Sequence, residues 1–409
     1  MSTGAASSSK LRILIFYETV FPDFIGGLEL RNFELARALS MRGHEVSLAG
    51  FSTSSIAPHP NVRLISLGPR RRLYASSGRR SLAHALRLSW AALRLDLRNY
   101  DVVETASMPF AHLLPLAVRC ALLGKPLLVT WYEYWGRYWL DYVGAVPGLL
   151  LLGLERILAQ LGTIALATSN LTGERLRYVR LRRIERLDCG VDLERVTRAA
   201  EVARHAARSN APSLIFVGRL IEHKRLDLLL RAVAKMAQVP GNSCLLTILG
   251  DGPDRDRLVR TSEALGLEDR VHFVRRVETS DEVYAALAAA RAAIQPSARE
   301  GFGLFPLEAL AAGLPVIYCE SPDSAIGELV RDGIEGIRVQ ADPDALAEKL
   351  TALLLDEVER ARLGANARRR AAQFDWAKIA ERFEELGWSA IAETDQNGPR
   401  ATPMSGPRE

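Results

Sequence analysis

Cysteine is scarce in this sequence, which holds four in 409 residues. The four, widely scattered and in apolar surroundings, are Cys120, Cys189, Cys244 and Cys319. Their spacing fits neither a metal site nor a disulfide framework, which is typical of a protein kept in a reducing cytosol. Long apolar runs are absent too, since no segment reaches the roughly 20 residues that span a bilayer. Residues 149–161 come nearest, but Glu155 and Arg156 interrupt them, so we expect a buried amphipathic helix there.

Two other signatures are missing. Neither half of the chain has a G-x-G-x-x-G turn after its first expected strand, which argues against a dinucleotide-dependent oxidoreductase. Residues 1–10 are small and polar without the apolar core of a signal peptide, so we expect a disordered leader. Residues 391–409 are rich in proline, glycine and polar side chains, and we expect a disordered tail there.

Charge of both signs is plentiful but unevenly divided. Residues 1–190 hold 24 Lys and Arg against 14 Asp and Glu, whereas the rest of the chain holds 29 against 34. The two halves therefore have different surroundings or partners. A basic first half is compatible with nucleic acid, anionic lipid or a phosphorylated acceptor, and charge alone does not choose among them.

The hydrophobic pattern predicts two α/β domains, because short β-branched runs alternate with helical periods twice along the chain. The pattern breaks near residues 188–212 and then restarts. We therefore predict a first domain over residues 11–190, a linker over 191–212 and a second domain over 213–374. Both sheets are expected to be parallel and doubly wound, with a cleft between the domains at the carboxyl ends of the strands.

The most specific motif is SAREGFGLFPLEALAAGLPV, residues 297–316. An expected strand at 292–295 ends in a loop with Glu300, and a helix begins near Pro306, where proline suits the first turn. Amides at a helix N-terminus beside small glycines form a site for an anion such as phosphate. Glu308 lies one turn into that helix, so the two carboxylates reach different parts of one ligand. A carboxylate commonly accepts the paired hydroxyls of a ribose.

Two cations and a glycine pair complete the predicted site. Gly218, Arg219 and Lys224 follow the first strand of the second domain, at the same sheet edge as that loop. An anion held between glycines, a helix N-terminus and two cations describes a diphosphate. In the first half, Gly26-Gly27 opens a helix N-terminus that faces the expected cleft.

With these motifs in order, the chain resembles the large retaining glycosyltransferase family 4, whose members have the GT-B fold of two Rossmann-like domains facing each other across a cleft. The resemblance runs from about residue 11 to residue 388, and its most specific element is the Glu-x7-Glu pair Glu300 and Glu308. The other matching elements are Gly26-Gly27-x-Glu29, Arg42-Gly43-His44, Cys189-Gly190-Val191-Asp192, Gly218-Arg219 with Lys224, Gly250-Asp251-Gly252-Pro253 and Phe374-Asp375-Trp376. The family's last helix, expected here over residues 375–390, crosses back to the first domain.

The resemblance implies a role for each matching residue. Arg219 and Lys224 bind the donor diphosphate and stabilise the leaving group. Glu308 holds the ribose hydroxyls, and Glu300 contacts the transferred sugar. The backbone around Phe302, Gly303 and Leu304 touches sugar and phosphate, and Gly26, Gly27 and Gly218 let the backbone approach the donor. The resemblance also implies retention of anomeric configuration by front-face attack, in which the leaving phosphate takes the acceptor proton, with no metal and no other cofactor.

The sequence departs from the family pattern at three positions. Tyr132 follows the expected strand at residues 127–131, where many relatives have a histidine near the transferred sugar. Tyr132 and Glu133 are therefore candidates for the sugar or acceptor side, and an aromatic packing cluster is the alternative. Arg225 and Arg275 occupy positions usually given to glycine, which leaves the base and the sugar open.

A basic helix is expected over residues 79–98. One face carries Leu82, Leu86, Leu93 and Leu97, and a second carries the stripe Arg80, Arg87, Arg94 and Arg98. The stripe is either membrane-facing, in contact with anionic headgroups, or the ordinary solvated face of a helix whose apolar side covers the sheet.

The sequence thus predicts a metal-independent, retaining hexosyltransferase that uses a nucleotide diphosphate sugar and a lipid-linked, saccharide or small-molecule acceptor. The alternatives are a sugar-nucleotide epimerase or hydrolase on the same fold, and a non-catalytic module that binds nucleotide sugars or membrane surfaces. No nucleic acid partner is expected. The expected location is the cytoplasm, with the inner face of the cell membrane as a peripheral site.

Overall fold

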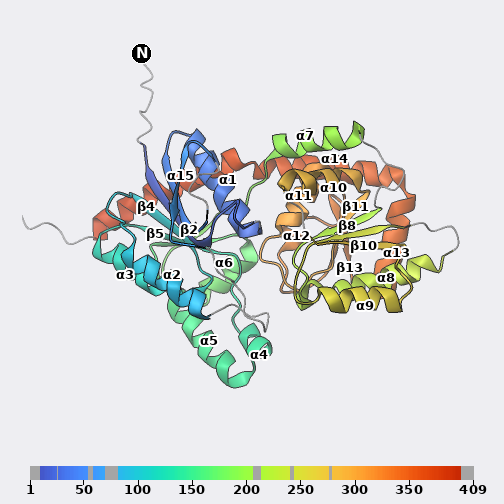
Figure 1. Cartoon of the computed structure of the whole chain (residues 1–409), viewed down its shortest axis with the longest axis horizontal. Coiled ribbons are helices and arrows are strands. Elements are labelled where there is room, and N and C mark those ends of the chain that lie inside the picture. Colours follow the sequence, from blue (N-terminus) through green and yellow to red (C-terminus); the bar gives the residue numbers. More distant parts are fainter. Residues whose placement is uncertain are drawn as a thin grey trace, which may run out of the picture. The chain divides into compact units, whose positions relative to one another are not determined.

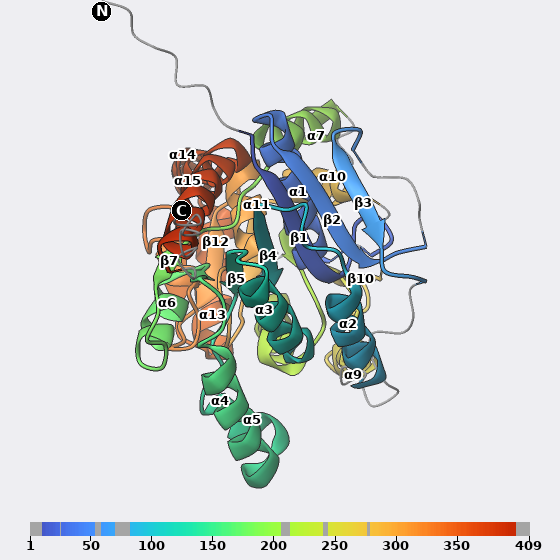
Figure 2. The same cartoon turned by 90° about the vertical axis from the view of Figure 1, so that its left-hand side faces the viewer.

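The computed structural model describes residues 10–24, 26–53, 59–69, 82–205, 213–239, 244–275 and 279–397. The chain forms two α/β units, each a twisted sheet covered by helices (Figures 1 and 2). The first unit comprises residues 1–166, 176–185 and 380–409, and the second comprises residues 167–175 and 186–379. Both sheets have crossover connections and a doubly wound strand order, so the predicted Rossmann-like fold class is confirmed.

The first unit is built on a seven-stranded sheet in the order β3-β2-β1-β4-β5-β6-β7. The pairs β2–β3, β1–β2, β1–β4 and β4–β5 are parallel. Chain order reverses between β1 and β4, which therefore flank a topological switch point. The strands are β1 (Arg12–Thr19), β2 (Glu45–Phe51), β3 (Val62–Ser66), β4 (Val102–Ala106), β5 (Leu127–Trp131), β6 (Ile164–Ala167) and β7 (Ile184–Arg186).

Helices connect these strands, and α1 shows how the apolar side of such a helix is buried. Leu35 and Leu39, one turn apart on α1, are fully buried, which explains why helical spacing predicted this helix. The helices up to β7 are α1 (Gly27–Met41), α2 (Leu82–Arg94), η1 (Phe110–His112), α3 (Leu113–Leu122), α4 (Tyr138–Val143), α5 (Ala145–Leu158) and α6 (Asn170–Arg177).

The second unit is built on a six-stranded sheet in the order β10-β9-β8-β11-β12-β13, and its pairs are parallel throughout. The chain runs outward from β8 to β9 and β10 and then returns to β11 on the other side of β8. The switch point therefore lies between β8 and β11. The strands are β8 (Leu214–Val217), β9 (Leu246–Leu249), β10 (Val271–Val274), β11 (Ala292–Gln295), β12 (Val316–Cys319) and β13 (Gly336–Val339).

Several helices of this unit begin at a side-chain cap. Asp342 accepts the amides of Asp344 and Ala345 ahead of Pro343, and Asp356 accepts the amide of Glu359. The helices from β7 onward are α7 (Leu193–His205), η2 (Glu222–Lys224), α8 (Leu226–Ala237), α9 (Arg255–Ala264), α10 (Ser280–Ala289), α11 (Leu304–Ala312), α12 (Ile326–Leu329), α13 (Pro343–Leu355), α14 (Glu357–Ala371), η3 (Ala372–Phe374) and α15 (Trp376–Asn397).

The predicted linker over residues 191–212 differs from the structure, because helix α7 occupies most of it. Val196 is fully buried on α7, and Arg195 forms an ion pair with Asp281 of α10. The apolar side of α7 otherwise consists of small residues such as Ala199, which gave too weak a pattern to predict a helix. The predicted boundary at residue 190 also differs, since residues 167–175 already belong to the second unit.

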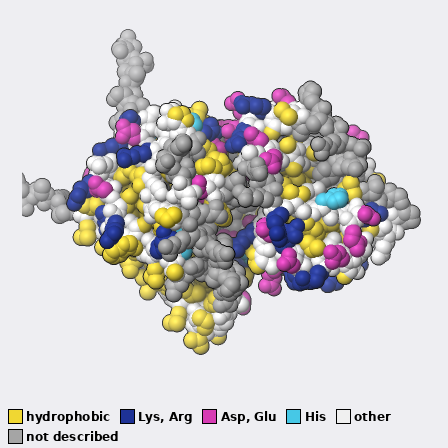
Figure 3. All heavy atoms as spheres, viewed as in Figure 1, with side chains coloured by type: hydrophobic (Ala, Val, Ile, Leu, Met, Phe, Trp, Pro, Cys, Tyr) yellow, Lys and Arg dark blue, Asp and Glu magenta, His cyan; other side chains and the backbone are white. Residues whose placement is uncertain are grey.

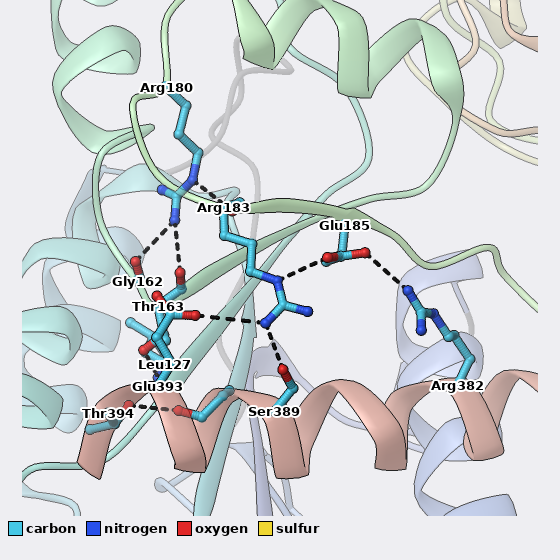
Figure 4. A network of polar contacts seen from close by, with 11 residues as sticks. Leu127, Gly162, Thr163, Arg180, Arg183, Glu185, Arg382, Ser389, Glu393 and Thr394 are labelled. Atoms are coloured by element: carbon cyan, nitrogen blue, oxygen red, sulfur yellow. Dashed lines mark hydrogen bonds and ion pairs between the residues drawn. The ribbon is translucent and has the colours of Figure 1, made fainter. Parts of the chain in front are cut away.

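Helix α15 begins in the second unit, and its residues from Ala380 onward belong to the first. Figure 4 shows the contacts made in the first unit, where Arg183 donates to Ser389 Oγ on α15 at 2.7 Å. Glu185 accepts from both Arg183 and Arg382 (Figure 4). Toward the end of α15, the Thr394 hydroxyl donates to the Ala390 carbonyl. The helix thus continues to Asn397, beyond the predicted end at residue 390, and the rest of the predicted tail lies outside the described residues, as does most of the predicted leader.

All four cysteines are buried and free, as their spacing predicted. Burial raises the pKa of the Cys120 and Cys244 thiols to about 12. Among the described residues, no helix has the length and apolarity needed to cross a membrane.

Candidate functional site

The predicted donor residues follow two neighbouring strands of the second unit. Gly218, Arg219 and Lys224 come after β8, and the Glu300 loop comes after β11, which pairs with β8 in parallel. The carboxyl ends of β8 and β11 flank the switch point, where open α/β sheets bind their ligands. The sheet topology therefore brings the two predicted motifs to one edge.

Lys224 and Glu300 form an ion pair, with side chains 15% and 12% exposed. The side-chain amide of Gln295, the last residue of β11, also donates to the Glu300 carboxylate and to Ser297 Oγ. Glu300 is held from both sides by backbone bonds, because its amide donates to the Asp323 carbonyl and its carbonyl accepts from Ala325. The sequence predicted separate roles for Lys224 and Glu300, and the structure adds a direct contact between them.

Glycines bring the loop after β8 close to the loop after β9. A Cβ on Gly250, which has φ of +152°, would lie 1.9 Å from the Gly218 carbonyl oxygen. A Cβ on Gly252 would lie 2.2 Å from the Leu220 carbonyl oxygen. The Leu220 amide donates to the Asp251 carbonyl, which ties the two loops together. Only glycines allow this approach, so these positions fix the path of the chain around Arg219.

Arg225 follows Lys224 and has a left-handed backbone, with φ of +50° and ψ of +40°. Among the described residues it is the only non-glycine with positive φ. A glycine would adopt this conformation freely, whereas it costs a residue with a side chain about 1–2 kcal/mol. Arg225 is also the residue before α8, so the turn it forms places Lys224 just ahead of that helix.

The loop after β11 ends at the N-terminus of α11. Gly303 precedes this helix with φ of +102°, and no side chain caps it. The helix starts at Leu304, two residues before the predicted start near Pro306. Phe302 is buried with its ring 6.0 Å from that of Phe374. The Phe302 side chain therefore packs inside the unit, and the backbone at Gly303 and Leu304 is what the site presents to an anion.

Glu308 lies one turn into α11 and is half-buried. Burial raises the pKa of its carboxyl to about 8, because the charged form loses its hydration. Among the described residues, the Glu308 side chain has no hydrogen-bond or ion-pair partner. A half-buried carboxyl without a protein partner suits a ligand that brings its own hydroxyl groups.

Two further residues of this site were missed by the sequence reasoning. His223 lies half-buried beside Lys224, and burial followed by the Lys224 charge lowers the pKa of its imidazole to about 4. Arg299 is buried next to Glu300 and forms an ion pair with Asp323 at 3.4 Å. Their positions directly before Lys224 and Glu300 were the available signal. The site therefore holds a neutral histidine and a third cation.

The first unit carries Gly26, Gly27, Tyr132 and Glu133. Gly26 precedes α1, and a Cβ there would lie 2.4 Å from Glu29 Oε2. Glu29 is buried and accepts a hydrogen bond from Thr19 Oγ1, at the end of β1. Tyr132 and Glu133 are half-buried in the loop after β5. The loop at Gly26 is therefore braced by a buried carboxylate.

A buried ion pair beneath these residues was not predicted. Arg31 of α1 and Glu104 of β4 are each 1% exposed and lie 2.8 Å apart. Thr130 Oγ1 of β5 also donates to Glu104, and the Arg31 guanidinium lies 5.9 Å from the Tyr132 ring centre. Separating such a pair would leave a buried charge uncompensated. The pair thus fixes α1 against the strand ends that carry the Tyr132 loop.

The arginine stripe predicted over residues 79–98 is only partly a surface stripe, and helix α2 ends at Arg94, before Arg98. Arg80 lies outside the described residues. Arg87 is half-buried, with its guanidinium 4.4 Å from the Phe51 ring centre. Arg94 and Arg98 are exposed. The predicted apolar side is also wrong in part, because Leu86 and Leu93 are exposed and His84, Leu88 and Ala92 are the residues that α2 buries.

No cluster of three or more His, Cys, Asp or Glu side chains placed to hold a metal ion occurs in the described part of the chain.

Two family models match the chain. The model described as Glycosyl transferases group 1 matches residues 197–370, and the model described as Glycosyltransferase Family 4 matches residues 25–195. Together they cover both units and the donor-side motifs.

Individual glycosyltransferases are also similar to this chain in sequence. The D-inositol 3-phosphate glycosyltransferase of Xylanimonas cellulosilytica is 30% identical over 395 residues, which are 87% of this chain and 89% of that protein. That of Salinispora arenicola is 33% identical over 284 residues, 63% of this chain and 61% of that protein. The match therefore spans less than two thirds of the Salinispora arenicola relative's length.

Solved structures share the fold. Sucrose-phosphate synthase from Thermosynechococcus elongatus aligns with a TM-score of 0.78 at 22% identity, covering 94% of this chain and 100% of that chain. Anabaena HepE in complex with UDP and glucose aligns with a TM-score of 0.71 at 20% identity, covering 93% and 100%.

Proposed function

Because the chain belongs to glycosyltransferase family 4, with its second half in the group 1 family, we propose that it moves a sugar from a nucleotide diphosphate sugar to an acceptor with retention of anomeric configuration. The donor binds the second unit at the switch point between β8 and β11. The observation that carries this assignment is the cluster at that edge, with Lys224 paired to Glu300 and Glu308 left without a partner among the described residues.

Each group has a distinct task on the donor. Arg219 and Lys224 bind the diphosphate, and Glu308 accepts the ribose hydroxyls. The backbone at Gly303 and Leu304 supplies amides to phosphate and sugar. Glu300 contacts the transferred sugar while Lys224 and Gln295 hold its carboxylate in place. Anabaena HepE, which shares the fold, has been solved with UDP and glucose, and this supports a donor of that chemical class.

The reaction is a single exchange of bonds at the anomeric carbon. The bond from this carbon to the donor phosphate oxygen breaks, and a bond to the acceptor oxygen forms on the same face of the sugar. The acceptor proton passes to the departing phosphate oxygen, so the products are a glycosylated acceptor and a nucleoside diphosphate. Arg219 and Lys224 stabilise the charge that the leaving group gains, since a cation about 4 Å from an anion contributes about 4 kcal/mol at an effective dielectric near 20.

This cationic arrangement replaces the divalent ion that many phosphate-transferring sites use. Transfer is therefore expected to continue in excess EDTA. Loss of activity that is restored by Mn²⁺ or Mg²⁺ would assign leaving-group stabilisation to a metal instead.

A donor panel tests the proposal. Thermal shifts with UDP-, GDP-, ADP- and TDP-sugars identify the nucleotide, because a ligand at 100 times its Kd stabilises a protein by about 2.7 kcal/mol. The selected donor is then incubated with an inositol phosphate, a saccharide and a lipid-linked sugar. Proton NMR of the product is expected to show the donor's own anomeric configuration. Nucleoside diphosphate and free sugar without a glycosylated acceptor would indicate a hydrolase.

A further inference from the structure

Three helices of the first unit expose apolar side chains on their outer sides. We call this set the apolar face, and it comprises Leu86, Trp90 and Leu93 on α2, Leu114, Val118 and Leu122 on α3, and Val146, Leu149, Leu150, Leu154 and Ile157 on α5. On α2 and α3 these residues recur at helical spacing, so each helix has one apolar stripe outward in addition to the side that it buries. Figure 3 shows hydrophobic side chains gathered along the lower left margin of this unit, where Figure 1 places α3 and α5. Apolar side chains exposed in such number mark an interaction site.

Helix α5 has the reverse of the expected polarity. The sequence predicted a buried amphipathic helix over residues 149–161, but Leu150 is 72% exposed and Ile157 is 65% exposed. Glu155, by contrast, is buried, at 1% exposure. Its carboxylate accepts the amides of Trp135 at 2.9 Å and Gly136 at 2.8 Å. Helix α5 therefore buries the Glu155 carboxylate and exposes its leucines to solvent.

The α4–α5 hairpin is firmly built. A Cβ on Gly148 would lie 2.6 Å from the Leu140 Cα, so the two helices pack backbone to backbone. Figures 1 and 2 both show the hairpin projecting from the body of the unit. Because Gly148 and Glu155 lock the hairpin on its inner side, its outer leucines are held in place as part of the fold.

Aromatic rings lie along α4, the first helix of this hairpin. Trp135 lies 4.5 Å from Trp139 and 5.1 Å from Tyr142, measured between ring centres, and Tyr142 is 46% exposed. Tryptophan and tyrosine favour the boundary between hydrocarbon and water, because they join an apolar ring to a polar group. The hairpin thus has leucines exposed on α5 and interfacial side chains along α4.

Cations border the apolar face. Arg94, Arg98 and Arg119 line a hollow of about 410 Å³ at the ends of α2 and α3, together with Asp96, Leu122 and Leu123. Arg94 lies over the exposed Trp90 ring at 4.3 Å. Arg156 on α5 and Arg137 before α4 are exposed beside the leucines. The border therefore carries an excess of positive charge next to apolar surface.

Apolar side chains bordered by cations indicate what kind of partner binds the apolar face. A second copy of the chain, packed face to face, would bring the same cations against these ones and would be repelled. A bilayer with anionic headgroups offers hydrocarbon to the leucines and phosphate to the arginines. We propose that the apolar face docks on an anionic membrane surface, with α5 lying in the interface and Arg94 and Arg98 on lipid phosphates. This docking is independent of the donor site proposed for the second unit.

Vesicle sedimentation with the full chain tests the proposal. The protein is expected to pellet with vesicles of phosphatidylcholine and phosphatidylglycerol and at least tenfold more weakly with phosphatidylcholine alone. The double variant Leu150→Glu/Ile157→Glu is expected to lose at least tenfold in affinity for the anionic vesicles. The matched control Leu355→Glu/Val358→Glu changes two apolar residues of the second unit that are 82% and 81% exposed, and it is expected to bind like the wild type.

The arginines are tested separately. Arg94→Glu and Arg98→Glu are each expected to weaken binding to anionic vesicles by roughly fivefold or more, since each basic residue near the surface contributes about that factor. No binding of the wild type to anionic vesicles, or equal binding by Leu150→Glu/Ile157→Glu, would overturn the proposal. A wild-type dimer in sedimentation velocity that this variant converts to monomer would assign the face to a second copy. Nucleotide titration of the same samples reports on the donor site independently, so failure of one proposal is distinguishable from failure of the other.

Discussion

At the scale of single residues, the contact between Lys224 and Glu300 sets what each can do. With 15% and 12% of their side chains exposed, the two are largely shielded from water, so their attraction is screened little. A diphosphate that reaches Lys224 arrives beside a carboxylate already held by Gln295. In the proposed function, Lys224 would therefore act on the leaving group and also position Glu300.

The substitution Lys224→Ala is expected to lower turnover by roughly 10²–10³-fold, because it removes charge that stabilises the leaving group and frees Glu300. Arg219→Ala is expected to give a loss of the same order. Steady-state kinetics with saturating donor measures both. Lys235→Ala is the matched control, since Lys235 is a lysine of the same unit that pairs with Asp344 on the surface. Activity of both site variants within a few-fold of the control would refute their role.

Glu308 makes a second residue-scale prediction, through pH. The unfolded chain releases this proton near the ordinary pKa of 4.5, and the folded protein releases it at about 8. Between these values the folded state holds more protons, so its stability falls as pH rises, by about 1.4 kcal/mol per pH unit from this group. Glu308→Gln is neutral throughout and lacks this slope.

Urea unfolding of wild type and Glu308→Gln between pH 5 and pH 8, without nucleotide, checks this sign. The free energy of unfolding of the variant is expected to gain on that of the wild type as pH increases. Curves that stay parallel over this range would show that Glu308 titrates near its ordinary pKa.

The sequence placed Lys224, Glu300 and Glu308 at one sheet edge because parallel strands expose their carboxyl ends together. It did not reveal the buried pair of Arg31 and Glu104, because that contact depends on how α1 packs against β4. Along the sequence the two residues are 73 positions apart, and no motif around either one indicates that they pair. Such pairs become visible only in three dimensions.

At the scale of elements, the loops after β8 and β9 act as one unit. Gly250 brings its backbone so near to Gly218 that any side chain would collide with the Gly218 carbonyl. The sequence identified Gly250-Asp251-Gly252-Pro253 as a matching element, and the structure gives the reason for its glycines. The path of the Arg219 loop depends on them.

We therefore expect Gly250→Ala to destabilise the protein by about 2–4 kcal/mol, through overlap and through an unfavourable backbone angle. Donor binding is expected to weaken as well, because the Arg219 loop must move. Gly266→Ala is the control for backbone angle alone, since Gly266 has φ of +65° and a Cβ there meets nothing within 4 Å. Thermal unfolding and nucleotide titration of both variants separate the two causes, and equal losses would contradict the collision.

Helices α7 and α5 show where patterns along the sequence failed. The buried side of α7 is built from small residues around Val196, which resemble a linker in composition. The segment of helix α5 was expected to be a buried amphipathic helix because Glu155 and Arg156 interrupt its apolar run, yet it exposes Leu149 and Leu150. Hydrophobic content predicts that a segment avoids water, and it does not distinguish a protein core from another apolar surface.

At the scale of the whole molecule, the two doubly wound units followed from the alternation of strands and helices, which appears in both halves of the sequence. The boundaries did not follow, since residues 167–175 join the second unit and residues from Ala380 onward join the first. The chain changes unit where strands and helices continue without a break, as in β6 and α15. The break in the hydrophobic pattern therefore gave the approximate middle of the chain. It did not give the residues at which the chain passes from one unit to the other.

In the proposed function, the second unit binds a nucleotide diphosphate sugar with Glu308 on the ribose and Glu300 on the sugar. Calorimetric titration with the bare nucleoside diphosphate, set beside turnover with the full donor, tests it most directly. Glu308→Ala is expected to weaken nucleotide binding by about 1.5–3 kcal/mol, the range for hydrogen bonds to a charged group. Glu300→Ala is expected to leave nucleotide binding nearly unchanged and to reduce turnover greatly. Equal loss of nucleotide binding in both variants, or no loss in either, would show that Glu308 and Glu300 do not bind these two parts of the donor.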